Sequence, residues 1–365
     1  MFQMLKRTDK TKIIGVCCLF LAVFFAVYIY ICKHDIVFTK IKDNVSLSFS
    51  VLLYDLDGAF ADRFDSYQII YDSKNKLLKV LSVNTEAIVF KKNERAKSLK
   101  TLFYENLKKS LGSAINKFYL DLREVIGNAA LSDFYINMSF KTFNDMLDSD
   151  KKIKSLLASN EFENKDLELL NYLEIVERVL YLLPRRFFKI QKNYKYVNTN
   201  IPKISLITLI FRIKKQVPIV MFCDMPVKYV RMRIEPNKQD IKGFLDKIYY
   251  NNNADVNINK KNVVAVDIKN ASRKSRMAEK IAWLLRANKF DVLDWGSLPT
   301  VYDVTLIKDY KGNFTQALKI SEILGIGKII VSYNPSVYAD INVFIGKDCK
   351  IYDSLDKKND ANGKH

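Results

Sequence analysis

SLSFSVLLYDLDG, residues 46–58, sets the fold class of this 365-residue chain. Polar and apolar residues first alternate, as in a half-buried strand, and an apolar run then leads into the Asp57-Gly58 turn. Two similar segments follow: SYQIIYD (66–72) and KLLKVLSVN (76–84), which are joined by the turn residues 72–75. The pattern predicts three neighbouring strands of one sheet.

Helical and strand-like segments alternate through the next 160 or so residues. Apolar spacing predicts helices at 96–111, 113–126, near 141, 164–183 and 238–250, the fourth ending before Pro184. Strands are predicted at 133–140, 217–226 and 229–236. Residues 45–250 are therefore expected to form an α/β domain with a central mixed sheet, followed by an Asn-rich linker at 251–262.

On the N-terminal side lies IIGVCCLFLAVFFAVYIYIC, residues 13–32, which contains no charged residue. Twenty residues at about 1.5 Å each cover the hydrocarbon core of a bilayer, so a transmembrane anchor is predicted. The tail at 1–12 carries four basic residues against Asp9 alone and is expected to stay in the cytoplasm. Because Tyr28 to Ile31 stand where a signal-peptide cleavage site would be needed, the anchor is expected to remain uncleaved. The chain is thus predicted to be a single-pass protein of the inner (cytoplasmic) membrane with extracytoplasmic domains.

The formal net charge is +19, of which the N-terminal tail contributes +3, leaving +16 on the exported part. This charge suits a membrane surface or an anionic envelope polymer as a partner. The basic residues are spread without a single stripe, so nucleic acid is not expected as a partner. Only Cys223 and Cys349 lie outside the predicted anchor, and two His in the whole chain disfavour a His-based metal site or a catalytic triad.

The segment 263–349 is predicted to form a small domain of β-α-β-β-α-β order, followed by a disordered tail at 355–365. Its segments VVAVDIKNAS (263–272), MAEKIAWLLRANKFDV (277–292), VTLIKDYKGNFTQALKISEILGIGKI (304–329) and ADINVFIGKD (339–348) resemble, in order, the LytR C-terminal domain of LytR-CpsA-Psr proteins. Arg276 departs from the pattern, because the family usually has Gly there.

The preceding region resembles the catalytic domain of the same family in outline, through VLLYDLD (51–57), 61–87, VNTNIP (197–202) and FCDMP (222–226). The resemblance implies a phosphotransferase that moves a polyprenyl-pyrophosphate-linked glycopolymer onto a wall acceptor. It also implies that Asp57 and Asp65 hold Mg²⁺, that Arg63 and Asp65 are catalytic, and that Arg63 binds phosphate. A turn at Asp57-Gly58 and a solvated loop at Arg63 and Asp65 explain these residues equally well.

Other departures weigh against catalysis. Thr85 and Glu86 stand where the family has Arg and Asp, and LLNYL (169–173) lacks the Arg and Gln that normally face the phosphates. Arg185 and Arg186 are candidate substitutes in substrate binding, although adjacent residues at a helix end are more often on the surface. Losing one phosphate contact costs on the order of 3 kcal/mol of transition-state stabilisation.

Two hypotheses remain. The first is a membrane-anchored envelope protein, a possible pseudoenzyme, that binds a polyprenyl-phosphate lipid, an anionic polymer or an envelope protein as a scaffold. The second is an active, divergent phosphotransferase that uses Mg²⁺. Convergence of Asp57, Arg63 and Asp65 beside a long apolar groove would favour the second, and a groove filled by side chains would disfavour it. Transcriptional regulation is not supported, because no DNA-binding motif is present.

Overall fold

The computed structural model describes residues 35–56, 63–90, 95–127, 132–147, 150–158, 165–215, 219–230, 233–250, 263–334 and 336–349. No helix within these ranges is long and apolar enough to cross a bilayer. The predicted anchor (13–32), the cytoplasmic tail (1–12), the linker (251–262) and the disordered tail (355–365) lie outside the described residues.

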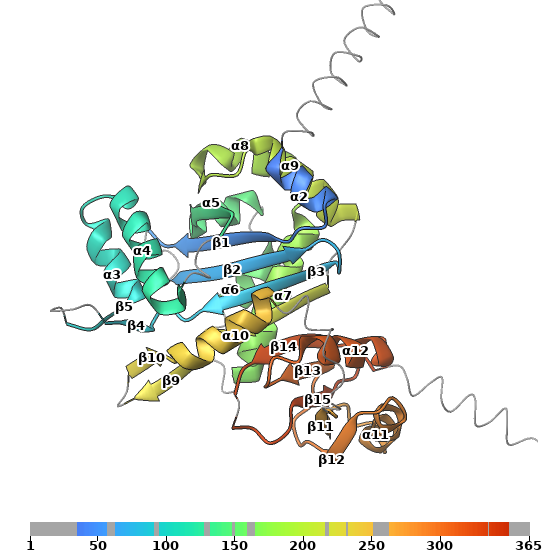
Figure 1. Ribbon diagram of the computed structural model, residues 1–365. Helices are drawn as coiled ribbons and strands as arrows, with labels where there is room; N and C mark the ends of the chain where they lie inside the picture. The colour runs from blue at the N-terminus through green and yellow to red at the C-terminus, as the bar shows by residue number, and fades with distance from the viewer. Residues whose placement is uncertain are drawn as a thin grey trace, which may run out of the picture.

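One mixed sheet of eleven strands runs through the described part of the chain (Figure 1). Its strand order is β12-β11-β15-β13-β14-β8-β3-β2-β1-β6-β7. The predicted α/β class with a central mixed sheet is confirmed. The strands are β1 (Leu47–Tyr54), β2 (Phe64–Asp72), β3 (Leu77–Val83), β6 (Phe134–Ser139), β7 (Asn198–Thr199), β8 (Ile219–Asp224), β11 (Ala265–Asn270), β12 (Asp291–Ser297), β13 (Leu306–Asp309), β14 (Lys328–Ser332) and β15 (Ile341–Ile345).

The three strands predicted first are confirmed as neighbours. β1 pairs antiparallel with β2 and β2 antiparallel with β3, with Leu53 opposite Asp65 in the first ladder. β3 reads as a nearly continuous apolar run because both of its faces are buried. Leu81 points to one core and Val80 to another on the opposite face. Two short ladders, β4 (Ile88–Val89) with β5 (Lys97–Ser98) and β9 (Val227–Val230) with β10 (Arg233–Pro236), lie outside the main sheet.

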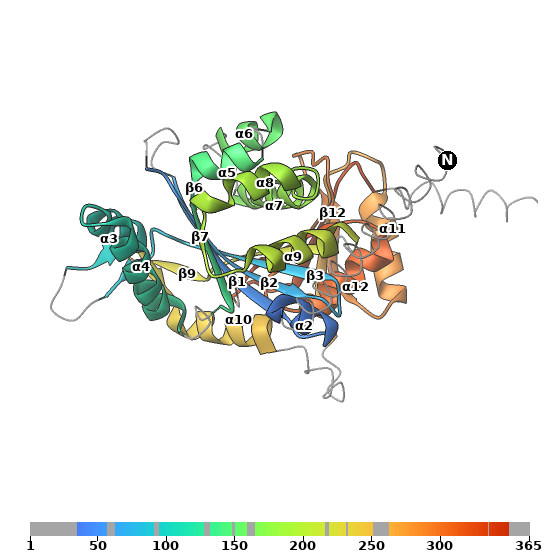
Figure 2. The ribbon, with the colours of Figure 1, turned by 90° about the horizontal axis from the view of Figure 1, so that it is seen from above.

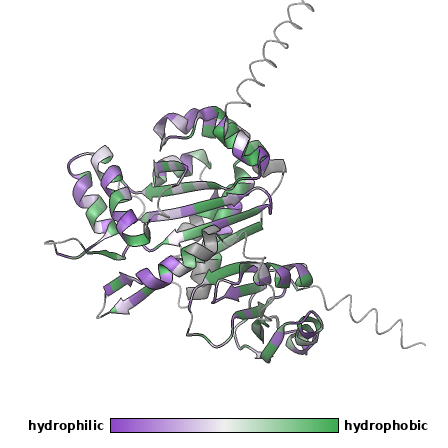
Figure 3. Cartoon of the chain, in the orientation of Figure 1, coloured by the Kyte–Doolittle hydropathy of each residue, from purple (hydrophilic) through white to green (hydrophobic). Residues whose placement is uncertain are grey.

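Helices cover both faces of the sheet, as the two perpendicular views show (Figures 1 and 2). One face packs against α3 (Leu99–Leu107), α4 (Leu111–Ile126), α10 (Lys238–Tyr250), α11 (Met277–Ala287) and α12 (Phe314–Leu324). The other packs against α2 (Ile36–Lys42), α5 (Phe140–Met146), α6 (Lys151–Ala158), α7 (Lys165–Leu182), α8 (Phe187–Asn193) and α9 (Lys203–Lys215), with the 3₁₀ turn η2 (Tyr194–Tyr196) between the last two. The strands between these layers are largely hydrophobic (Figure 3).

The C-terminal unit has one strand more than the predicted β-α-β-β-α-β order. After β11-α11-β12-β13-α12-β14 the chain adds β15, which inserts between β11 and β13. β15 runs parallel to β11 and antiparallel to β13. The fifth strand joins the two halves of the unit into a continuous part of the sheet.

The C-terminal unit continues the sheet of the preceding unit. β14 pairs parallel with β8, which in turn pairs parallel with β3. Side-chain contacts also cross this boundary: Lys328 forms an ion pair with Glu177 of α7, and the Lys79 ammonium lies 5.5 Å from the Phe314 ring centroid. Burial lowers the pKa of Lys79. Cys223 and Cys349 are both free thiols with no exposed surface.

Candidate functional site

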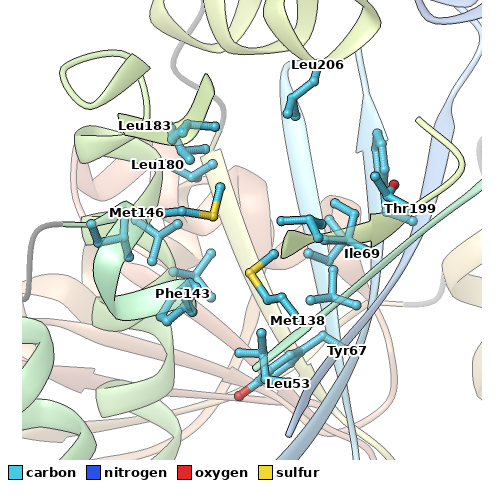
Figure 4. A pocket seen from close by; sticks show the side chains of 18 of the residues that line it. Leu53, Tyr67, Ile69, Met138, Phe143, Met146, Leu180, Leu183, Thr199 and Leu206 are labelled. Carbon is cyan, nitrogen blue, oxygen red and sulfur yellow. The ribbon is translucent and has the colours of Figure 1, made fainter. Parts of the chain in front are cut away.

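An apolar cavity of about 250 Å³ lies between the sheet and the helices of one face. Its walls come from β1, β2, β3 and β6 below and from α5, α7, α8 and α9 above (Figure 4). Representative lining residues are Leu53, Ile69, Met138, Met146, Leu180 and Leu206. An apolar space beside Asp65 is therefore present and is not filled by side chains, which is part of the arrangement that would favour the phosphotransferase.

The cavity lies where the apolar faces of the covering helices point toward the sheet without filling the space between the two layers. α7 contributes Val176, Val179 and Leu180, which recur at helical spacing, and α9 contributes Leu206 and Leu209. Most of these side chains are only partly buried, although they belong to the packed clusters of the core. An apolar chain could replace water in this space with little rearrangement of the protein.

Asp65 is the one charged residue among those that line the cavity in the described part of the chain. It lies on β2 opposite Leu53, beside Tyr67, which marks one end of the cavity in Figure 4. Burial raises the pKa of Asp65, and the Arg63 and Lys100 cations together with a hydrogen bond from Tyr67 offset part of that rise. A carboxyl group and two cations thus meet at the end of an apolar space.

The loop that follows β3 closes this polar end. Thr85 Oγ1 donates a hydrogen bond to the Phe64 carbonyl oxygen over 3.0 Å, and Glu86 lies 3.5 Å from the Lys100 ammonium. The Lys100 amide donates to the Thr85 carbonyl oxygen. Thr85 and Glu86 therefore lie beside the segment that contains Arg63 and Asp65.

Lys100 is the residue that the sequence interpretation missed. It is the second residue of α3, a helix capped by Ser98, so its ammonium lies near a helix N-terminus that carries a partial positive charge. A lysine among so many lysines gives no signal by itself. The useful signal is Ser98, two residues before Lys100, because a serine cap fixes where the helix begins.

Of the other predicted site residues, the structure describes Arg185 and Arg186. Asp57 is outside the described residues. Arg185 stacks on the Tyr181 ring at 4.1 Å, and Arg186 directly precedes α8. Leu183, two residues before Arg185, lies at the opposite end of the cavity from Leu53 in Figure 4. These arginines therefore lie at the junction of α7 and α8.

The predicted Mg²⁺ site finds only part of its ligands. Of the predicted carboxylate pair, the structure describes Asp65 alone, and the nearby Arg63 and Lys100 cations offset only part of the effect of burial on its pKa. Within the described ranges no three His, Cys, Asp or Glu side chains come together as metal ligands would. Because Asp57 lies outside the described residues, the predicted Mg²⁺ site stays a prediction.

In the C-terminal unit, the motif residues Gly346 and Asp348 are hydrogen bonded to Thr305. Asp348 Oδ1 accepts hydrogen bonds from the Thr305 amide at 2.8 Å and from the Thr305 hydroxyl at 2.7 Å. The Gly346 amide donates to the same hydroxyl at 3.0 Å. A Cβ atom at Gly346 would lie 2.3 Å from the Val304 carbonyl carbon, so this close approach of two chain segments requires glycine.

Residues 263–348 match the family described as "LytR cell envelope-related transcriptional attenuator". These residues form a LytR C-terminal domain. The resemblance of this segment to that domain is thereby confirmed. In this LytR C-terminal domain the departure at Arg276 has a structural reading, because Arg276 adopts a left-handed conformation (φ 56°, ψ 16°) ahead of α11. Glycine adopts this conformation at no steric cost, and Arg276 is instead held by an ion pair with Glu279.

Solved structures that align with the chain include the Lin1025 protein from Listeria innocua, with 11% identity, a TM-score of 0.41, and coverage of 55% of this chain and 95% of that one. "TagT bound to LI-WTA" aligns with 13% identity, a TM-score of 0.39, and coverage of 54% and 87%. Bacillus subtilis TagU aligns with 9% identity, a TM-score of 0.39, and coverage of 55% and 95%. No curated protein matches the chain.

Proposed function

We propose that this protein is a membrane-anchored cell-envelope protein that binds the prenyl chain of a lipid-linked envelope glycopolymer. The apolar cavity carries the proposal. Its walls are almost entirely aliphatic and aromatic, and its polar end presents Asp65 with the Arg63 and Lys100 cations nearby. A polyprenyl phosphate matches this arrangement, because it has an apolar tail with a phosphate at one end.

The envelope setting is supported by two independent features. The LytR C-terminal domain belongs to a family described as cell-envelope related. The uncharged stretch at 13–32, with basic residues before it, suits a single anchor in the cytoplasmic membrane whose folded part lies outside the cytoplasm. An anionic glycopolymer or its lipid carrier would also match the positive charge of the exported residues.

The proposed role is binding or scaffolding with a weakened or lost transferase site. At the polar end Thr85 supplies a hydroxyl and Glu86 a negative charge in place of the family's Arg and Asp. Glu86 also pairs with Lys100, which reduces the positive charge available to a phosphate. Arg63 alone offers a guanidinium fork for bidentate phosphate contact there.

The test is to purify the full chain in detergent from cells that make polyprenyl phosphates and to identify the extracted lipid by mass spectrometry. We expect a polyprenyl phosphate in the wild type and its loss from Leu180→Trp, because the indole would occupy the cavity. Leu120→Trp is the matched control, since Leu120 is 63% exposed on α4, on the other face of the sheet. A wild-type sample without prenyl lipid, or equal lipid in both variants, would contradict the proposal.

An active phosphotransferase is the second candidate, and the placement of Asp65 at the end of the cavity is the observation that favours it. In this case the chain would transfer a glycopolymer from a synthetic polyprenyl-pyrophosphate donor to a wall acceptor in the presence of Mg²⁺. Asp65→Ala should abolish this transfer and leave the fold intact. Lipid binding without transfer by the wild type would favour the scaffold role instead.

A further inference from the structure

We infer that α8, η2 and α9 form a docking surface for an anionic lipid bilayer. This α8–α9 surface is defined by four exposed side chains: Phe188 (82% exposed), Tyr196 (60%), Ile204 (43%) and Phe211 (55%). Large apolar and aromatic side chains that are exposed together usually belong to an interaction site. The inference goes beyond prenyl-chain binding, because it concerns the outside of the helices whose inner faces line the cavity.

α9 is apolar on two opposite sides. Its inner side chains Leu206, Leu209 and Ile210 line the cavity, while Ile204 and Phe211 are exposed. Ile204 and Phe211 are seven residues apart and so share one face of the helix. A helix that is apolar on both sides is normally covered on both sides. The sheet covers only the inner side of α9.

The exposed aromatic rings continue from α9 onto α8. The Phe211 ring lies 5.7 Å from the Phe187 ring, and Phe187 lies 5.5 Å from Phe188. In α8, Ile190 is buried and lines the cavity, so the helix is anchored by its inner side and presents Phe188 outward. Aromatic residues are enriched where proteins meet the headgroup region of a membrane.

The charge is less evenly spread than the sequence analysis indicated, because this part of the chain carries basic residues without acidic ones. No Asp or Glu occurs from residue 178 to residue 223, a stretch of 46 residues in which the chain average of 40 acidic residues in 365 would give about five. The same stretch contains ten basic residues: Arg178, Arg185, Arg186, Lys189, Lys192, Lys195, Lys203, Arg212, Lys214 and Lys215. Lys189, Lys192, Lys195 and Lys203 are exposed. A basic residue near an anionic leaflet is attracted to it by about 1 kcal/mol, which makes an anionic bilayer the complementary partner.

The predicted anchor brings the α8–α9 surface to the membrane. Asp35 Oδ2 accepts a buried hydrogen bond of 2.6 Å from the Ser205 hydroxyl of α9, and the adjoining helix α2 packs on α9. Figures 1 and 2 both show α2 beside α9. Only three residue steps separate Cys32, the last residue of the predicted anchor, from Asp35, which is about 10 Å at most. This step rests on the anchor in the proposed function.

The test places the full chain in nanodiscs whose acyl chains are brominated and quench tryptophan on contact. Phe188→Trp puts a probe on the surface, and the native Trp283 and Trp295 in the LytR C-terminal domain provide the background signal. In discs of equal parts phosphatidylglycerol and phosphatidylcholine we expect the added tryptophan to be quenched. Leu120→Trp, on α4, is the control and should not be quenched.

The role of charge is tested in the same discs. Replacing Lys189, Lys192 and Lys195 together with Gln should lower the quenching of Phe188→Trp to the level seen in discs of phosphatidylcholine alone. Unquenched Phe188→Trp in the anionic discs would overturn the docking surface, and equal quenching in both kinds of disc would overturn its anionic preference.

The two experiments distinguish a failure of the docking surface from a failure of polyprenyl phosphate binding. Quenching of Phe188→Trp in a sample that carries no polyprenyl phosphate would retain the docking surface and contradict the proposed cargo. Bound polyprenyl phosphate without quenching would retain the proposed cargo and contradict the docking surface. A chain that is absent from the disc fraction would overturn the docking surface too, because the surface is argued from the anchor.

Discussion

Asp65 shows how one side chain can link the fold to the proposed activity. A carboxyl group at the end of an apolar cavity costs stability when it ionises, and the Arg63 and Lys100 cations recover only part of that cost. The net result is a pKa above the ordinary range for Asp. A phosphate group arriving at Arg63 and Lys100 would compete with this carboxyl group for the same cations.

The raised pKa of Asp65 gives a stability prediction. The folded state holds the Asp65 proton to higher pH than the unfolded state does, so the wild type loses stability as pH rises from the ordinary Asp range through the raised pKa. Asp65→Asn removes this loss and should be more stable than the wild type at neutral pH, with the difference shrinking in acid. Thermal unfolding at several pH values measures it.

Asp294→Asn serves as the control of opposite sign. Lys269 lowers the pKa of Asp294, so the Asp294 carboxylate contributes stability that is present above its ordinary pKa and disappears as pH falls through the lowered one. This exposed pair should have a much smaller effect. A stability difference for Asp65→Asn that does not vary with pH would contradict the assignment.

Arg276 gives a prediction about the backbone. Left-handed conformation costs a residue with a Cβ atom roughly 1–2 kcal/mol, a cost that glycine avoids. Arg276→Ala removes the ion pair with Glu279 and keeps the Cβ atom, so it isolates the conformational cost. We expect Arg276→Gly to be more stable than Arg276→Ala by about 1 kcal/mol in chemical denaturation. Equal stability of the two variants would contradict the left-handed backbone at this position.

Arg63 and Asp65 could be picked out as candidates because a resemblance marked them. The structure places Asp65 in the lining of the cavity, with Arg63 two residues before it. Lys100 could not be picked out, because its importance depends on where α3 begins relative to the loop at Thr85. Arg185 and Arg186 were chosen for their charge alone, which carries no information about which end of the cavity they lie near.

Elements with a strong period were predicted well. α7 was expected to end before Pro184 and does so, and α11 buries Met277, Ile281 and Leu285 on one face. α9 was not predicted: its sequence KISLITLIFRIKK has β-branched residues at Ile204, Ile207, Thr208 and Ile210, and apolar residues all around the helix hide the period. The feature that obscured α9 in the sequence is the same one that supports its role at a membrane.

The helix register of α11 can be tested directly. Leu285 has no exposed surface, whereas Trp283 on the same helix is 63% exposed. Leu285→Asp would bury an unpaired carboxylate, which costs several kcal/mol and should abolish cooperative unfolding of the LytR C-terminal domain. Trp283→Asp should change stability little. Similar melting curves for the two variants would show that the register is wrong.

For the whole molecule, the main finding that the sequence did not predict is the continuous sheet. The Asn-rich segment at 251–262 indicated a linker between two separate domains, and no local signal shows that β14 will pair with β8. Pairing between distant strands depends on which edges remain open after each unit has folded, and residue patterns describe only the faces of a strand.

The continuous sheet predicts coupled unfolding. Because β8 is hydrogen bonded to both β3 and β14, and Lys328 pairs with Glu177, loss of the LytR C-terminal domain should destabilise the remaining unit. A chain ending at residue 250 should therefore melt at a lower temperature than the N-terminal unit of the full chain. Hydrogen exchange of the β8 amides provides the residue-level readout. Unchanged exchange at β8 would contradict the pairing.

The β8–β14 ladder also gives the LytR C-terminal domain a protective role. Without this ladder, β8 would be an open edge strand that contains the apolar residues Val220 and Phe222. Its unpaired backbone groups could then pair with any other extended chain, which is a common start of aggregation. The C-terminal domain occupies that edge and ends the sheet instead at β12, where charged Asp291 and Asp294 are exposed and discourage further pairing. The LytR C-terminal domain would in this way protect the neighbouring unit from aggregation.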